Sequence, residues 1–250
     1  MSACKNCEAP LDGKYCANCG QKASTRRIVT RDLFKDLLKK LVPWDKGFFY
    51  TVRRLVTGPG IMVREYLDGK RVDYAKPLNF LFVVTAISLL VFDKELFLQG
   101  MNQQTGQDFK ENQQVQQLIT WLFSHMSLVM TGLIPFLALV SKLLFRKSGE
   151  NYAEHLVLNL YMMAGCMVVY FPVMPILQLT KQDPTNPWSG ILGILPYLVF
   201  FVWGYIQFFK PQNRIWGAFK ALLTYGLGYM LYIFAIGIAV SFWVLFSIAE

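Results

Sequence analysis

Four cysteines near the N-terminus have the spacing of a metal site. Two Cys-x-x-Cys pairs, Cys4 with Cys7 and Cys16 with Cys19, are separated by eight residues. Two residues between thiolates let one tight turn present both sulfur atoms to a tetrahedral ion at about 2.3 Å, and four thiolates favour zinc. Because such a site is closed, its expected role is structural: the ion folds residues 1–23 into a zinc ribbon that is too short to fold alone.

Two other chemistries suit paired cysteines. Two disulfides would satisfy the same spacing, but the cytoplasmic location expected for this segment disfavours them. A redox Cys-x-x-Cys would be expected to open a helix in a strand-rich domain, and nothing in the surrounding sequence indicates one. The fifth cysteine, Cys166, lies inside a long apolar run and is expected to be an ordinary buried side chain.

A second polar pair, Glu154 and His155, stands at the start of an apolar run. A Glu–His pair can act as an acid–base couple or ligate a metal. The chain has only two histidines, and the sequence places no partner carboxylate nearby. The expected role is therefore an interfacial hydrogen bond, with a lipid-acting enzyme as the alternative.

A block of alternating charges, from Arg64 to Tyr74, precedes the first long apolar run. These side chains could form a salt-bridge network that fixes the angle at which the chain enters the membrane. Alternatively, the three cations Arg64, Lys70 and Arg71 could bind a lipid phosphate. The sequence leaves both interpretations open.

The elements that must position these residues begin with a basic linker, residues 24–76. Leu33, Leu37 and Leu41 recur at helical spacing, with lysines on the opposite side, and a similar pattern follows. Such amphipathic helices either lie in the headgroup layer of the inner leaflet or pack under the membrane helices as a cytoplasmic collar. Nucleic acid binding by the linker arginines is disfavoured, because basic residues beside a membrane are expected from topology alone.

Composition identifies the remainder, residues 77–250, as a membrane domain. Of the 250 residues, 54% are hydrophobic and 16% are charged, whereas soluble domains have about a quarter of their residues charged. A disordered chain and a collagen-like fibre are excluded. The apolar residues form long runs, and a spanning helix needs roughly 20 such residues. The runs are 78–98, 118–145, 156–179, 189–209 and 221–248. The expected fold is an all-α integral membrane protein with about five transmembrane helices.

The distribution of Lys and Arg predicts the orientation of this domain. Residues 1–76 hold 16 Lys and Arg against 8 Asp and Glu. With five spans and the N-terminus inside, the inner side carries 22 basic residues and the outer side only Lys94, Lys110 and Lys181. The positive-inside rule therefore predicts a cytoplasmic N-terminus and a periplasmic C-terminus. The first run is the weakest, because charged residues interrupt it after Phe92.

Several of these residues together resemble a known pattern. They are the paired Cys-x-x-Cys with Gly20-Gln21, Pro59-Gly60, Arg64-Glu65-Tyr66-Leu67-Asp68-Gly69-Lys70-Arg71, Tyr74, Pro77 and Tyr152-Ala153-Glu154-His155-Leu156. Over essentially its whole length the chain is similar to a bacterial family of multi-spanning inner-membrane proteins with an N-terminal zinc ribbon, catalogued as a domain of unknown function. The resemblance implies architecture and location but no activity. Glu8 departs from the pattern, because zinc ribbons often have glycine there.

The sequence narrows the class of function without identifying an activity. No Asp, Glu, Lys or Arg lies well inside any of the five apolar runs, which argues against an ion-coupled transporter. The leading hypothesis is a non-enzymatic inner-membrane protein whose zinc ribbon and basic collar form a docking platform for a cytoplasmic protein partner or anionic lipid. The alternative is a homo-oligomeric channel or pore, of the general build of small multi-span proteins in bacterial antiviral systems.

Overall fold

The computed structural model describes residues 2–37, 47–91, 116–117, 120–121, 124–173 and 187–248. These segments are mostly helical, with two very short strands near the N-terminus. In chain order the elements are β1 (Ser2–Ala3), β2 (Pro10–Leu11), α1 (Thr30–Leu37), α2 (Gly47–Thr57), α3 (Pro59–Asp68), α4 (Pro77–Val91), α7 (Met126–Leu144), the 3-10 turn η1 (Arg146–Ser148), α8 (Tyr152–Tyr170), α10 (Pro187–Phe209) and α11 (Arg214–Ile248).

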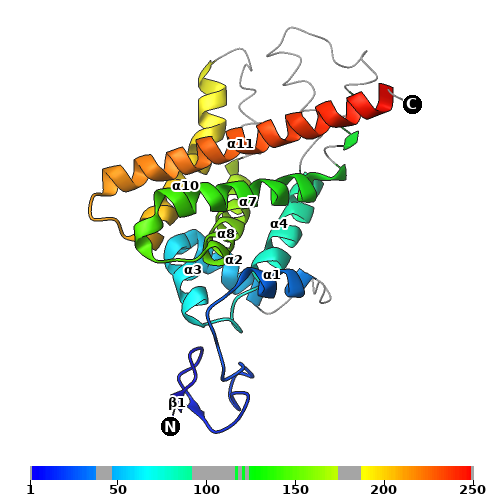
Figure 1. Ribbon diagram of the computed structural model, residues 1–250. Helices are drawn as coiled ribbons and strands as arrows, with labels where there is room; N and C mark the ends of the chain where they lie inside the picture. Colours follow the sequence, from blue (N-terminus) through cyan, green and yellow to red (C-terminus); the bar gives the residue numbers. More distant parts are fainter. Residues whose placement is uncertain are drawn as a thin grey trace.

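The cysteine segment forms a small lobe at one end of the molecule, and the helices are stacked above it (Figure 1). We call this lobe, residues 2–23, the cysteine ribbon. In it β1 pairs antiparallel with β2, and an isolated antiparallel bridge joins Tyr15 to Lys22. Each pairing closes one loop, so two short hairpins stand side by side in the sequence, each carrying one Cys-x-x-Cys.

Helix α8 is the central helix of the body. It begins with a capping box, in which the Asn151 side chain accepts from the Glu154 backbone N–H while the Glu154 carboxylate accepts from the Asn151 backbone N–H. From there α8 packs against α7, α4 and α10. Most of its apolar surface is inside the molecule, and Tyr161 and Met162 are completely buried. This helix supplies the core around which the others are arranged.

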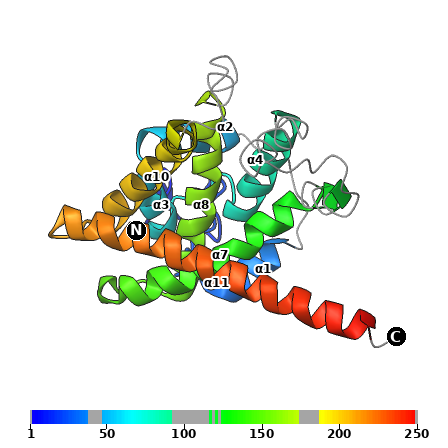
Figure 2. The same ribbon diagram turned by 90° about the horizontal axis from the view of Figure 1, so that it is seen from above.

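Helix α11 lies on the outside of the body. It packs across α7 and α10, and both of its ends extend past the neighbouring helices (Figure 2). Only 17% of its most apolar part is buried inside the molecule, and large apolar side chains such as Met230 and Phe234 are exposed. An aqueous solvent would not stabilise such a surface.

The linker helices α2 and α3 pack onto the body. Leu55 of α2 is fully buried, and α3 approaches α10 so closely that a Cβ atom on Gly60 would lie 2.2 Å from the carbonyl oxygen of Gly204. Of the two arrangements that the sequence allowed, this packing favours the collar. The outer sides of these helices remain apolar in places, since Phe49 and Ile61 are exposed.

Two described helices are long and apolar enough to cross a membrane, Tyr152–Tyr170 and Arg214–Ile238. Shorter apolar helices occupy parts of the other three predicted runs: Pro77–Leu90, Leu128–Leu144 and Ile194–Phe209. The predicted ends of the first and third runs, 92–98 and 174–179, lie outside the described residues, as do linker residues 38–46 and parts of 118–123. An all-α fold is therefore confirmed, and two of the five expected spans have sufficient length in the structure.

Candidate metal centre and the interface that holds it

The four N-terminal cysteines lie together and could bind a metal ion. Their sulfur atoms are all within 4.8 Å of one another. The Sγ atoms of Cys4 and Cys19 are 3.6 Å apart, and those of Cys7 and Cys16 are 3.5 Å apart. Sulfur atoms at about 2.3 Å from a tetrahedral ion are about 3.8 Å from one another. The cluster therefore has the size of a four-thiolate site.

The two cysteine turns repeat the same backbone pattern. In the first, Cys4 N–H donates to the carbonyl of Ala9 and Glu8 N–H to that of Cys4, both at 2.8 Å. In the second, Cys16 N–H donates to Gln21 at 2.8 Å and Gly20 N–H to Cys16 at 2.9 Å. Each turn also ends in the left-handed region, with φ of 62° at Glu8 and 74° at Gly20. Glu8 thus occupies a position that favours glycine.

Two of the thiols have opposite pKa shifts. A hydrogen bond from the Ala9 backbone, joined by one from the Asn18 side chain, lowers the pKa of Cys7 to about 6. Burial raises the pKa of Cys19 to about 12. Cysteine binds metal as the thiolate, and a thiol that ionises near neutral pH supplies this form readily. A bound metal ion would convert the other thiols to thiolates as well.

A buried glutamine makes two of the hydrogen bonds that attach the ribbon to the helical body. Gln21 donates through Nε2 to the carbonyl of Gly69 at 2.8 Å and accepts through Oε1 from the Arg71 backbone N–H at 3.0 Å. Asn6 adds a hydrogen bond of 3.0 Å to Asp73. The Arg71 side chain also donates to the carbonyl of Arg26, just after the ribbon, at 2.8 Å. The segment 69–73, directly after α3, is therefore where the ribbon contacts the helical body.

Glu154 and His155 have separate partners. Arg27, just after the ribbon, donates to both carboxylate oxygens of Glu154 at 2.7 and 2.6 Å and to the carbonyl of Gly149 at 2.7 Å. The Nδ1 atom of His155 lies 2.6 Å from Oγ of Ser141 on α7, and both side chains are buried. This geometry connects the start of α8 to the linker and to α7. The Glu154 carboxylate and the His155 imidazole do not point toward one common atom, as an acid–base pair would.

The three candidate lipid-binding cations are engaged to different extents. Arg64 donates to Glu150 and to the carbonyl of Phe208, both at 2.7 Å, and its guanidinium lies 4.0 Å from the centre of the Phe208 ring. Arg71 belongs to the ribbon interface, and Lys70 is half-buried beside it. These contacts favour the salt-bridge network over the phosphate site.

Sequence reasoning missed the partners that complete these contacts. The sequence does not connect Glu154 with Arg27 or Arg64 with Glu150, which lie 127 and 86 residues away along the chain. From the sequence, Arg27 is considered only as one of the linker arginines. No local spacing connects residues so far apart. The sequence also assigns no role to Gln21, which it shows only as part of the Gly20-Gln21 pair after Cys19. A polar side chain directly after a metal turn is the one signal that pointed to it.

A match to a protein-family model covers the segment to which the ribbon is hydrogen-bonded. Residues 45–89 match a family model described as "Protein of unknown function (DUF3667)". This segment runs through α2, α3 and most of α4, and includes residues 69–73. The expectation of a domain of unknown function is therefore confirmed. No curated protein and no solved structure matches the chain.

Proposed function

We propose that the chain is a non-enzymatic protein of the bacterial inner membrane whose zinc-bound cysteine ribbon docks a cytoplasmic protein partner. The observation that carries this proposal is the way the ribbon is mounted. Gln21 fixes the ribbon to residues 69–71, directly after α3. The outer surface of the ribbon is accessible to solvent, and Tyr15 is 63% exposed there. A large aromatic side chain held on a rigid support is typical of an interface anchor.

The ion proposed for the ribbon is zinc. Four cysteine sulfurs are the donor set of structural zinc sites, and all four coordination positions would be filled by the protein. The ion would fold and stiffen the ribbon without offering a position for a substrate. The residues that would hold it are Cys4, Cys7, Cys16 and Cys19, whose sulfur atoms are already gathered within 4.8 Å.

Support for five alternating membrane crossings comes from the helix ends that meet at the collar. Phe145 at the end of α7 stacks on Phe209 at the end of α10, with ring centres 4.0 Å apart. Lys220 in the first turns of α11 lies 5.6 Å from the Phe145 ring. The start of α8 contacts the linker through Glu154. At the start of α4, Ala75 N–H donates to Thr51 of α2 at 2.8 Å.

In this arrangement the start of α4, the turn between α7 and α8, and the end of α10 contact the collar, and the start of α11 lies beside the end of α7. The ends on this side of the molecule therefore alternate along the chain. Alternation of this kind is what five successive crossings require. It supports a cytoplasmic N-terminus together with the ribbon, and a periplasmic C-terminus.

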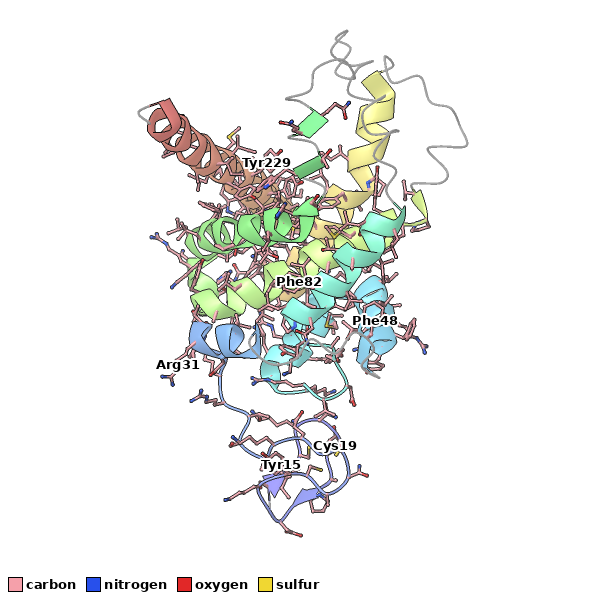
Figure 3. The ribbon with its side chains drawn as sticks, turned by 90° about the vertical axis from the view of Figure 1, so that its right-hand side faces the viewer. Tyr15, Cys19, Arg31, Phe48, Phe82 and Tyr229 are labelled. Atoms are coloured by element: carbon pink, nitrogen blue, oxygen red, sulfur yellow. The ribbon has the colours of Figure 1, made fainter. Side chains whose placement is uncertain are left out.

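A protein partner fits the ribbon better than anionic lipid does. Tyr15 and Lys22 are paired across the bridge, which places both side chains on one side of the ribbon. The ribbon also lies at the end of the molecule opposite Tyr229 on α11, as the labelled Tyr15 and Cys19 show (Figure 3). In the collar, Arg27, Arg54 and Arg64 already form ion pairs with carboxylates of the chain.

Photo-crosslinking in living cells tests the docking proposal. A photoreactive phenylalanine analogue is placed at Tyr15, and the same analogue at Tyr229, also exposed, is the matched control. We expect an adduct of defined mass with a cytoplasmic protein from position 15 alone. The adduct should disappear when Cys16→Ser and Cys19→Ser are added, while the amount of chain in the membrane is unchanged. No cytoplasmic adduct from position 15, or the same adduct from position 229, would overturn the proposal.

The alternative function, a homo-oligomeric channel, has one observation in its favour. The exposed apolar side of α11, which includes Met230 and Phe234, could contact a second copy as well as lipid. Release of a small dye from liposomes that contain the purified chain, together with a ring of copies in native mass spectrometry, would support the channel. A monomer or dimer that releases no dye would support the docking role.

A further inference from the structure

A second basic surface lies on the body, apart from the ribbon and its interface. It is formed by the turn between α7 and α8, the turn between α10 and α11, and the helix ends that adjoin these turns. The Phe145–Phe209 stack and the approach of Lys220 to Phe145 hold the two turns together. The basic side chains of this surface, which we call the turn patch, are Lys142, Arg146, Lys147, Lys210, Arg214 and Lys220.

Within the described segments, no acidic side chain neutralises the charges of the turn patch. The cations are exposed, except for the half-buried Lys220. None of the six forms an ion pair with a residue in the described segments, in contrast to Arg27, Arg54 and Arg64 of the collar. The two turns contain one acidic residue, Glu150, and Arg64 already binds it at 2.7 Å. The patch therefore offers a concentrated positive charge to an external anion.

Apolar aromatic side chains stand directly beside these cations. Trp216 stacks on Phe219 with ring centres 5.2 Å apart, and the side chains are 56% and 47% exposed. Ile215 is 82% exposed, and Leu143 on α7 is 64% exposed. Lys220 lies 5.9 Å from the Trp216 ring. Exposed aromatic side chains beside cations and exposed aliphatic side chains are typical of the boundary between lipid headgroups and acyl chains.

We propose that the turn patch binds the phosphate headgroup of an anionic phospholipid, with Arg146 and Lys210 as the principal cations and Trp216 against the adjoining acyl region. Arg146 directly follows Phe145 and Lys210 directly follows Phe209, so the ring stack joins the two turns that carry these cations, and both cations are exposed. Paired cations around a phosphate form charge-assisted hydrogen bonds. This inference rests on the membrane location proposed above and is independent of the ribbon and its partner.

The test is native mass spectrometry of the full chain, titrated with phosphatidylglycerol or with phosphatidylcholine. The double variant Arg146→Gln/Lys210→Gln is compared with Arg31→Gln/Arg53→Gln, which removes the same charge from exposed residues elsewhere. We expect the first variant to weaken phosphatidylglycerol binding by at least about tenfold and the second to leave it within about twofold. The charge-preserving variant Arg146→Lys/Lys210→Arg should retain most of the binding.

Three results would overturn the lipid site. They are an equal loss of binding in both glutamine variants, an equal affinity for phosphatidylcholine, and displacement of phosphatidylglycerol by inorganic phosphate at the same concentration. A chain that does not enter bilayers at all would overturn the proposed membrane location itself. A chain that enters them without preference for the anionic lipid would overturn only the site.

Discussion

Gln21 and Gly69 lie 48 residues apart in the chain and are joined by a buried hydrogen bond of 2.8 Å. The same Gln21 amide also accepts from the Arg71 backbone, so one side chain satisfies two main-chain groups of the segment that follows α3. This relationship makes the ribbon part of the folded body. It also explains why Gln21, two residues after Cys19, and the segment after α3 belong to one functional unit.

The first prediction concerns this attachment. Gln21→Ala removes both hydrogen bonds and leaves the buried Gly69 carbonyl and the half-buried Arg71 N–H without this partner, at a cost of about 1–3 kcal/mol. We expect the Arg71 amide to exchange with deuterium much faster, and the linker after the ribbon to be cleaved more readily by protease. Helix α8 should keep its protection. Unchanged exchange at Arg71 would show that Gln21 does not hold the interface.

The second prediction concerns the left-handed residue in each cysteine turn. At a φ of 62°, Glu8 carries a conformational cost of about 1 kcal/mol that glycine avoids, so Glu8→Gly should stabilise the metal-bound ribbon. Gly20→Ala should destabilise it by a similar amount. A Cβ atom on Gly20 would meet nothing within 4 Å, so the penalty is conformational and not steric.

Resistance to a zinc chelator measures both changes on the full chain. A difference of about 1 kcal/mol is about a fivefold shift in the chelator concentration that removes half of the metal. The two variants should shift this midpoint in opposite directions. Shifts in the same direction, or no shift in either variant, would contradict the equivalence of the two turns.

The third prediction tests the contact between α3 and α10. Gly60→Ala would place a Cβ atom 2.2 Å from the Gly204 carbonyl oxygen and 2.4 Å from the Phe208 nitrogen. The helices must then separate, at a cost of about 1–3 kcal/mol. The control is Gly58→Ala, two residues earlier, where the nearest atom would be at an ordinary 3.6 Å. Thermal unfolding in detergent should show a lower midpoint for Gly60→Ala alone.

The fourth prediction concerns pH and the carboxyl group of Glu65. Burial raises its pKa, but hydrogen bonds from Tyr74 and Arg54 outweigh burial, so the net pKa lies below the usual value. A carboxyl group with a lowered folded-state pKa stabilises the fold above its unfolded pKa of about 4.3, and the contribution is lost as pH falls through the folded value.

We therefore expect the stability of the wild-type chain to decline below about pH 5 more steeply than that of Glu65→Gln. Unfolding followed at several pH values between neutral and acid measures this difference. Parallel acid limbs for the two proteins would show that Glu65 does not contribute to the pH dependence.

Much of the fold could be predicted from sequence, because its signals are local. The cysteine spacing indicated a compact four-sulfur cluster, and the apolar runs indicated helices, including α8 and α11. The runs did not reveal that α8 is central and α11 peripheral, because both are apolar on all sides. Which helix is buried by its neighbours depends on contacts between helices, such as that of Leu137 on α7 with α11 at Gly228.

The candidate site was harder to predict, because its contacts join distant parts of the chain. Glu154 was expected to make an interfacial hydrogen bond, but nothing near it in sequence indicated Arg27. Arg64 was considered for lipid phosphate, and its pairing with Glu150 depends on the packing of α3 against the turn before α8. The carboxylates that neutralise the collar are therefore visible only in the folded chain.

The most direct test of the central claim is the metal content of the full chain, measured by native mass spectrometry of the detergent-purified protein. The account predicts one zinc ion per chain. It also predicts that Cys16→Ser/Cys19→Ser removes the ion while the chain still inserts into the membrane. A wild-type chain that carries no metal and has its four N-terminal cysteines in disulfides would contradict it, because the ribbon would then be neither a metal site nor a cytoplasmic platform.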